Sequence, residues 1–177
     1  MKKNLLIAVA ALMLSACVGV PDGITPVGNF ERDRYLGRWY EVARLDNRFE
    51  AGMSQVTATY SRNDDGSIAV LNRGFVDAEG AWKEAEGVAK FVDSEDRGHL
   101  KVSFFGPFYS SYVVFELAED YSYSFVTSRD KSYLWLLSRT PRVDESLKQH
   151  FVARARELGF AADEIMFIDQ SQHNTAN

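Results

Sequence analysis

Strand-like runs separated by turn signals fill most of the chain and constrain its fold more than any other feature. Segments rich in Gly, Asp, Asn and Ser, such as RNDDGS at 62–67 and DSEDRG at 93–98, divide runs rich in aromatic and β-branched residues. We predict strands over 39–45, 54–61, 67–75, 81–91, 99–105, 111–117, 123–128 and 133–139. Short sequential connections are typical of an up-and-down antiparallel meander, and so many strands avoid exposed edges by closing into a barrel.

One helix follows the predicted strands. Its apolar stripe consists of Leu147, Phe151, Ala155 and Leu158. Asp144 is placed to cap its start, and Gly159 supplies the left-handed residue that ends it. The stripe must lie against the outer wall of the barrel. Segment 164–169 then forms a short final strand beside the first, and the polar residues 171–177 form a disordered tail.

Residues 1–16 are typical of a secretory signal peptide. Lys2 and Lys3 precede an apolar run that ends at Leu14, which is too short for a membrane-spanning helix. The sequence LSAC at 14–17 resembles the lipobox of bacterial lipoproteins, in which the cysteine is acylated and becomes the first residue. An ordinary signal peptide followed by an incidental free thiol is the alternative.

Cys17 is the only cysteine, so no disulfide can form within the chain, and a thiol consumed by lipid fits this count. Residues 17–30, with Gly and Pro at short intervals, are predicted to be the acylated N-terminus and a tether, and 31–170 the folded domain. In lipoproteins the residue after the cysteine steers sorting. Val18, in place of aspartate, implies the outer membrane of a Gram-negative bacterium, with the protein facing the periplasm.

The composition excludes several classes of function. A formal net charge of −5 gives no electrostatic reason to bind nucleic acid. His99, His150 and His173 are scattered over a strand start, the helix and the tail. The sequence contains no metal-ligand spacing, phosphate loop or nucleophile elbow. We therefore expect no cofactor, no metal site, no catalytic residue and no enzymatic activity.

Three short motifs resemble those of the lipocalin family in order and spacing. They are Gly37-x-Trp39-Tyr40 at the first strand, Asp120-Tyr121 before the seventh, and Arg139 closing the eighth. The stretches YLGRWYEVAR, LKVSFFGPFY and YLWLLSRTP are similar to the bacterial outer-membrane branch of the family, to which apolipoprotein D is related. The second motif departs from the pattern, because Glu119 stands where the family usually has threonine.

The resemblance covers 30–169 and implies an all-β fold, an eight-stranded up-and-down antiparallel barrel with one C-terminal helix packed outside. In lipocalins the motif tryptophan and arginine close one end, so Trp39 and Arg139 are predicted to form a cation–π pair worth about 2 kcal/mol. Beyond this plug, alternate residues of the first strand face water, which accounts for Arg44. Glu41 and Glu116 are predicted to point inward and to pair with Arg139 or a tyrosine.

The period of two along each strand, started from Arg139, assigns the side chains that face the interior. The predicted ligand-lining set is Val56, Ala58, Tyr60, Ile68, Val70, Asn72, Ala89, Phe91, Val102, Phe104, Tyr112, Val114, Val126, Tyr133, Trp135 and Leu137. Small residues in this set leave space between large ones. An eight-stranded barrel can hold one small ligand or fill itself, and the family favours a ligand.

The open end of the predicted barrel is apolar with basic edges. Its rim and head-group residues are predicted to be Arg48, Phe49, Phe108, Arg129 and Lys131. This composition suits a lipid whose tail enters while its phosphate or carboxylate stays outside. We predict a membrane-anchored lipid-binding lipocalin that holds one acyl chain of a lysophospholipid or fatty acid, for envelope lipid storage, transport or maintenance. The alternatives are an interaction lipoprotein with a filled barrel, docking a partner or a second copy as a homodimer, and a lipid-processing enzyme.

Overall fold

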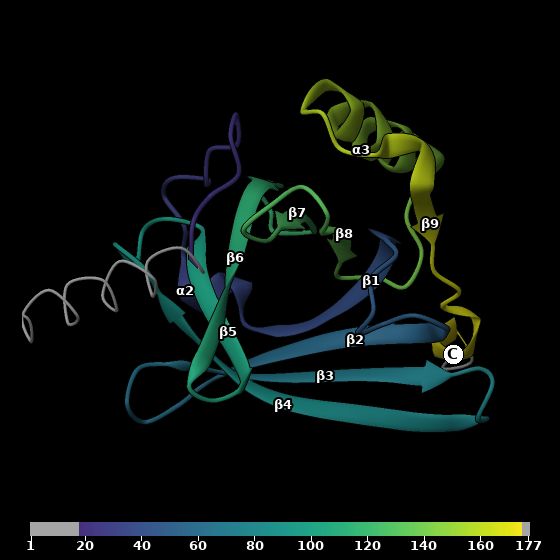
Figure 1. The fold of residues 1–177 in the computed structure, drawn as a ribbon, viewed down its shortest axis with the longest axis horizontal. Helices are drawn as coiled ribbons and strands as arrows, with labels where there is room; N and C mark the ends of the chain where they lie inside the picture. The colour runs from purple at the N-terminus through teal and green to yellow at the C-terminus, as the bar shows by residue number, and fades with distance from the viewer. Residues whose placement is uncertain (1–17, 175–177) are drawn as a thin grey trace, which may run out of the picture.

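Antiparallel strands close into a barrel in the computed structural model, which describes residues 18–174 (Figure 1). The strands are β1 (Gly37–Leu45), β2 (Met53–Arg62), β3 (Ile68–Val76), β4 (Ala81–Phe91), β5 (His99–Phe105), β6 (Phe108–Leu117), β7 (Tyr123–Thr127) and β8 (Leu134–Ser138). Each pairs with the next along the chain, and β1 pairs with both β2 and β8. The predicted eight-stranded meander is confirmed. The predicted signal peptide and Cys17 lie outside the described residues.

The remaining elements lie around the barrel. They are α2 (Arg32–Tyr35), α3 (Glu145–Glu157), η1 (Ala162–Glu164), β9 (Ile165–Phe167) and η2 (Ser171–Asn174). As Figure 1 shows, α3 lies outside the barrel, on the side of β7 and β8. Phe151 and Ala155 of α3 are buried against Phe125 and Leu136, as the apolar stripe predicted. Asp144 occupies the N-cap position of α3, but its side chain makes no capping hydrogen bond there.

The short strand β9 pairs antiparallel with β1, so the predicted final strand beside the first is confirmed. Gly159 follows α3 with a φ of 79°, the left-handed conformation that ends the helix. An apolar cluster between α3 and the barrel wall forms one core of the protein, and a second cluster fills the closed end inside the barrel. The barrel wall is therefore apolar on both faces where α3 covers it.

Pairing shifts occur at four places in the barrel, and the two in β1 and β6 overturn predictions of which side chains face the interior. In β1, the pairing with β8 shifts between Glu41 and Ala43, so Arg44 faces inward, opposite Trp135. In β6, the pairing with β7 shifts between Val114 and Glu116. The Glu116 carboxylate therefore lies outside, hydrogen-bonded to His150 and 3.4 Å from the Arg154 guanidinium on α3. The predictions that Arg44 faces water and that Glu116 faces inward are both wrong.

The segment predicted as a tether packs against the barrel over its described length. The amide of Val27 donates to the Val114 carbonyl, and the amide of Phe30 donates to Asp96, at 2.9 and 2.8 Å. Ile24 and Phe30 are buried in the outer and inner clusters respectively. The absence of periodicity in 18–30 reflects a segment that forms no strand, since its apolar residues pack individually.

The C-terminal segment closes a seam between β1 and β2. These strands pair only near the closed end of the barrel, from Gly37 to Tyr40. Beyond that, the Gln170 side-chain amide donates to the carbonyls of Glu41 and Val56, both at 2.8 Å. Residues 171–174, predicted as part of a disordered tail, instead form η2, because hydrogen bonds with Gln55 hold them on the barrel.

Candidate functional site

A plug built on Trp39 and Arg139 closes one end of the barrel. The Arg139 guanidinium lies 3.8 Å from the centroid of the Trp39 ring, so the predicted cation–π pair is confirmed. Arg139 also donates to the carbonyls of Arg38 and Arg34, at 3.0 and 2.7 Å. Gly37 has a φ of 97°, and a Cβ there would lie 3.3 Å from the Arg139 guanidinium. The motif glycine thus serves both the backbone conformation and the close approach of the arginine.

The second motif shapes a turn at the same end. The Asp120 carboxylate accepts the amide of Ser122 at 2.9 Å, which stabilises the turn, and hydrogen bonding from the Ser122 side chain and amide lowers the pKa of Asp120. Tyr121 has a φ of 62° and accepts the amide of Glu31 on its hydroxyl at 2.8 Å. Since Arg139 also donates to the Tyr121 carbonyl, at 3.4 Å, the plug joins all three motifs.

A group of tyrosines forms the floor above the plug. The Tyr112 hydroxyl lies 2.7 Å from that of Tyr35 and 2.9 Å from that of Tyr60, and Tyr35 also bonds to Ser124. Burial raises the pKa of Tyr35 to about 12 and raises that of Tyr60 and Tyr112. The floor is therefore polar but uncharged. Tyr35 is not among the residues predicted from the sequence, although it stands four residues before Trp39 and packs on its ring, with centroids 4.8 Å apart.

The predicted lining residues fall into two groups according to their height in the barrel. Towards the closed end, a buried cluster contains Tyr60, Ile68, Val70, Ala89, Val114, Val126 and Leu137. Phe91 joins it by packing on Phe30, with ring centroids 6.0 Å apart. Val56 is buried beside Gly74. These residues are part of the packed core, and they leave the remaining lining residues as the accessible wall.

The accessible wall faces the open end of the barrel. Its members, all only partly buried, are Ala58, Asn72, Val102, Phe104, Tyr133 and Trp135, with Tyr112 of the floor beside them, and all but Asn72 and Tyr133 also pack against the inner cluster. Ala85 pairs with Asn72 and faces inward with it, yet Ala85 is exposed. Solvent therefore reaches the inner wall from the open end. Within the described chain, the buried Oδ1 atom of Asn72 has no hydrogen-bond partner, which makes it a polar point on a largely apolar wall.

An ion pair lies inside the barrel on β1. The Arg44 guanidinium donates to the Glu41 carboxylate at 2.7 Å and to the Glu50 carbonyl at 2.6 Å. The Glu50 carboxylate accepts the Trp135 indole N–H at 2.9 Å, which holds the β1–β2 loop over the wall. Burial and the Glu50 carboxylate raise the pKa of Glu41 well above its usual range, against the attraction of Arg44. Arg44, not Arg139 or a tyrosine, is the partner of Glu41.

The predicted rim residues lie at the open end and differ in their surroundings. Phe49 and Phe108 are 58 % and 78 % exposed, and the Arg48 guanidinium covers the Phe49 ring at 4.7 Å. Arg129 pairs with its neighbour Asp130 at 3.3 Å. The Lys131 ammonium lies next to Gly159, at the end of α3. Two exposed phenyl rings thus lie on this rim, and two of its cations, Arg48 and Arg129, already have partners within the protein.

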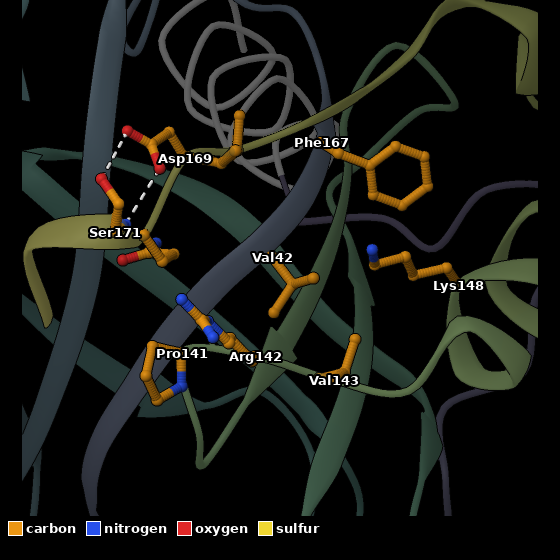
Figure 2. Close-up of a pocket in the computed structure, with 10 residues that line it drawn as sticks. Val42, Pro141, Arg142, Val143, Lys148, Phe167, Asp169 and Ser171 are labelled. Carbon is orange, nitrogen blue, oxygen red and sulfur yellow. Dashed lines mark hydrogen bonds between the residues drawn. The ribbon is translucent and has the colours of Figure 1, made fainter. Parts of the chain in front are cut away.

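A hollow of about 320 Å³ lies outside the barrel, between β9, the start of α3 and the segment after β8. Figure 2 shows Val42, Val143 and Phe167 beside this hollow, with Lys148 at its edge and hydrogen bonds joining Asp169 to Ser171. The hollow has no connection to the predicted lining residues. It brings together none of the residues that sequence analysis assigned to ligand binding.

The described residues include no cluster of His, Cys, Asp and Glu side chains that could hold a metal ion. Between 18 and 174, no helix has the length and apolar character needed to cross a bilayer. His99, which is buried, and His150 and His173 lie far apart in the sequence and are bonded to different partners, respectively Val18, Glu116 and Gln55. The inner wall of the barrel is thus the candidate site.

A barrel plugged at one end, with an apolar inner wall accessible from the other, defines a binding protein of the calyx type. Residues 30–170 match the family model described as a lipocalin-like domain. The chain belongs to the lipocalin family.

Similar proteins extend this assignment. The chain is 51 % identical to the outer membrane lipoprotein Blc of Vibrio cholerae, over 95 % of this chain and 99 % of that protein. It is 46 % identical to the Blc protein of Escherichia coli K12, over 92 % and 93 % of the two chains. Insecticyanin of the tobacco hornworm has the same fold, with a TM-score of 0.70 at 17 % identity over 88 % of each chain.

Proposed function

We propose that this protein is an outer-membrane lipoprotein that binds one acyl chain, of a lysophospholipid or a fatty acid, within its barrel. In this role it stores, carries or maintains lipids of the envelope of a Gram-negative bacterium, on the periplasmic side. It acts by binding and not by catalysis. The close relatives named outer membrane lipoprotein Blc support the location and the class of protein.

The observation that carries the proposal is the change in burial along the inner wall. Near the plug, the inward side chains are buried, whereas Phe104 and Trp135 are only partly buried and Ala85 is exposed, although all three face inward. An acyl chain lying there would cover apolar surface, and each buried methylene contributes about 0.8 kcal/mol. The uncharged hydroxyls of the floor offer no charge that would repel or attract a carboxylate at that depth.

Two features suit an amphiphile with a polar head near the open end. The Asn72 side chain offers a hydrogen-bond acceptor on the wall, and the Arg48 guanidinium lies on the rim beside Phe49. The polar group of the lipid would stay at this level while its tail extends toward the tyrosines. This arrangement favours a single-chain lipid, because the closed end is packed.

Mass spectrometry of an organic extract of the purified protein tests the proposal, and a single-chain lipid near one per protein is expected. Titration with a lysophospholipid should then shift the Trp135 emission in a saturable way. The Trp135→Phe variant is the control, since it should lose most of the shift while retaining binding in a competition assay. An extract without lipid, together with no saturable shift, would favour the filled-barrel interaction protein. Conversion of the lipid to a product would establish an enzyme.

The anchor has its own test. In Cys17→Ser the thiol that would carry lipid is gone, so the protein should leave the outer-membrane fraction. Mass spectrometry of the wild-type N-terminal peptide should show an acylated Cys17. Sedimentation of Cys17→Ser with outer membranes after a salt wash would contradict the lipobox interpretation.

A further inference from the structure

The hairpin formed by β5 and β6 presents two large apolar side chains to solvent at the open end of the barrel. Phe105 is 76 % and Phe108 is 78 % exposed. They stand at the ends of the two strands, on either side of the two-residue link at 106–107. Neither belongs to an apolar cluster of the barrel. An exposed apolar pair of this kind marks a surface that another molecule covers.

Charge divides the open end into two sides. Residues 97–115 contain no acidic side chain, although the whole chain contains 25 aspartate and glutamate residues. On this hairpin the Lys101 ammonium lies 5.2 Å from the Tyr109 ring. The turn between β3 and β4, also at the open end, carries Asp77 and Glu79. The hairpin is therefore apolar, with Lys101 as its cation, whereas the β3–β4 turn carries two carboxylates, of which Glu79 pairs with Lys83 at 2.6 Å.

The start of the described chain is fastened to the same two strands. Ser111 of β6 donates to the Gly19 carbonyl at 2.6 Å, and Nε2 of His99, at the start of β5, lies 3.1 Å from the Val18 carbonyl. Val20 packs against the outer cluster. Val18 is bonded directly to Cys17, the residue proposed to carry the acyl chains. The anchor therefore joins the barrel at the wall that ends in the apolar hairpin.

The distances are short enough for the anchor and the hairpin to meet one membrane surface. Ser111 stands three positions after Phe108 on β6, which corresponds to about 10 Å along a strand. Apolar side chains at a membrane interface are buried about 5–10 Å below its surface. A barrel held at Val18 therefore has its exposed phenyl rings within reach of the lipid that holds the anchor.

We propose that Phe105 and Phe108 insert into the surface of the phospholipid bilayer that carries the anchor. An acid-free cationic edge complements anionic lipid, with about 1 kcal/mol for each lysine or arginine near the surface. The inference rests on the proposed anchoring at Cys17 and goes beyond it by fixing an orientation. The open end of the barrel lies at the membrane on its β5–β6 side, so a lipid passes between bilayer and barrel without crossing water.

A fluorescent label at defined sites tests this orientation in the acylated full-length protein. Since Cys17 is the only cysteine and would be blocked by lipid, an introduced cysteine is the only free thiol. Gly106→Cys places a label on the hairpin, where a Cβ meets no atom within 4 Å. The controls are Glu79→Cys in the β3–β4 turn and Asp64→Cys at the closed end. The proteins are reconstituted in vesicles of phosphatidylethanolamine and phosphatidylglycerol.

The label at 106 should shift its emission to the blue and be quenched by brominated lipids, while those at 79 and 64 remain as in water. Equal emission from all three labels on protein that floats with the vesicles would overturn the inference and leave the anchor intact. If the protein does not float with the vesicles and Cys17 is unmodified, both the proposed anchor and this inference are wrong. If the label at 106 is shielded in lipid-free protein, and more so at higher protein concentration, a second copy of the protein covers the hairpin. That result would also overturn the inference.

A second measurement separates docking from ligand binding. The variant Phe105→Ser should retain the affinity for a fluorescent lysophospholipid in solution, because Phe105 is 76 % exposed and belongs neither to the lining nor to the rim residues assigned to the ligand. Its rate of lipid transfer to vesicles should fall at least several-fold. Unchanged transfer would contradict the membrane contact, whatever the affinity.

Discussion

The Arg44 guanidinium donates a 2.7 Å hydrogen bond to the Glu41 carboxylate inside the barrel, although the two residues stand three apart on one strand. On a regular strand they would face opposite sides. The bulge between Glu41 and Ala43 brings the side chains of Glu41 and Arg44 to the same face. There the Glu41 side chain is 4 % exposed and the Arg44 side chain is 1 % exposed. The ion pair is therefore a consequence of the bulge.

Removing one member of this pair is expected to be costly. In Arg44→Met the Glu41 carboxyl stays buried without its cation, and the loss should be about 3–5 kcal/mol in the free energy of unfolding. The double variant Glu41→Gln/Arg44→Met should be closer to wild type than Arg44→Met alone. Arg38→Met, at an exposed position of the same strand, is the control. Urea denaturation measures all four proteins, and equal midpoints for Arg44→Met and Arg38→Met would contradict the buried pair.

The same carboxyl predicts a pH dependence of stability. The pKa of Glu41 is raised in the folded state, mainly by burial, above its ordinary value of 4.5. Between that value and the raised one the folded protein binds more protons than the unfolded chain, so the stability from Glu41 declines as the pH rises through this window. Glu41→Gln does not titrate. The stability of wild type relative to Glu41→Gln should therefore fall as the pH rises above 4.5, and parallel curves would contradict it.

The plug gives a third prediction. Arg139→Ala removes the guanidinium from the Trp39 ring and three hydrogen bonds to backbone carbonyls. We expect a loss of about 2–4 kcal/mol in unfolding free energy, from packing and cation–π attraction together. Arg139→Lys keeps the positive charge but not the planar guanidinium group. Its unfolding free energy should therefore lie between those of wild type and Arg139→Ala. A denaturation midpoint for Arg139→Ala equal to that of wild type would contradict the role of the stack.

The seam gives a fourth prediction. Gln170→Leu preserves size but leaves the carbonyls of Glu41 and Val56 without the donor that bridges them. Because buried carbonyls without a hydrogen-bond donor are costly, the unfolding free energy should fall by about 2–4 kcal/mol. Gln172→Leu, at an exposed position of the same segment, should change it less. Hydrogen exchange should also quicken along the open half of β1 and β2 in Gln170→Leu, and protection equal to wild type there would contradict the bridging role.

Much of this fold could be predicted because strands, turns and the plug have local signals. The alternation of apolar residues set the strand limits, and the spacing of Trp39 and Arg139 placed the closed end. The bulges could not be predicted, since neither Val42 nor Phe115 stands in a segment with glycine or another residue typical of a bulge. Each bulge reverses the side assigned to every residue beyond it, which is why Arg44 and Glu116 were misplaced.

The segments at the two ends show a different limit. Residues 18–30 and 168–173 bond to the barrel through isolated hydrogen bonds, some from side chains, such as Ser111 with Gly19, and some between backbones, such as Val27 with Val114. Such contacts leave no period in the sequence. Ile24 and Phe30, apolar residues in a Gly- and Pro-containing segment, were the only local indication that this part packs on the barrel.

The inner wall gives the last prediction. By period two, Ala85 and Ala89 both face inward, but Ala89 is buried between Ile68 and Val102 whereas Ala85 is exposed. Enlarging Ala89 would disturb the packed core. In Ala85→Trp the indole instead occupies space that solvent reaches, so stability should change little. A lipid tail that loses contact for two or three methylenes forfeits about 0.8 kcal/mol for each, and affinity should fall roughly tenfold or more.

Glu86→Trp supplies the matched control, because Glu86 is the next residue of β4 and points to the outside. Isothermal titration of wild type and both variants with a lysophospholipid measures the affinity independently of the added tryptophan. Glu86→Trp should bind as wild type does, because the added indole lies in water on the far side of the strand. Equal binding by Ala85→Trp would show that the acyl chain does not lie along β4, since an indole on that wall leaves no room for it.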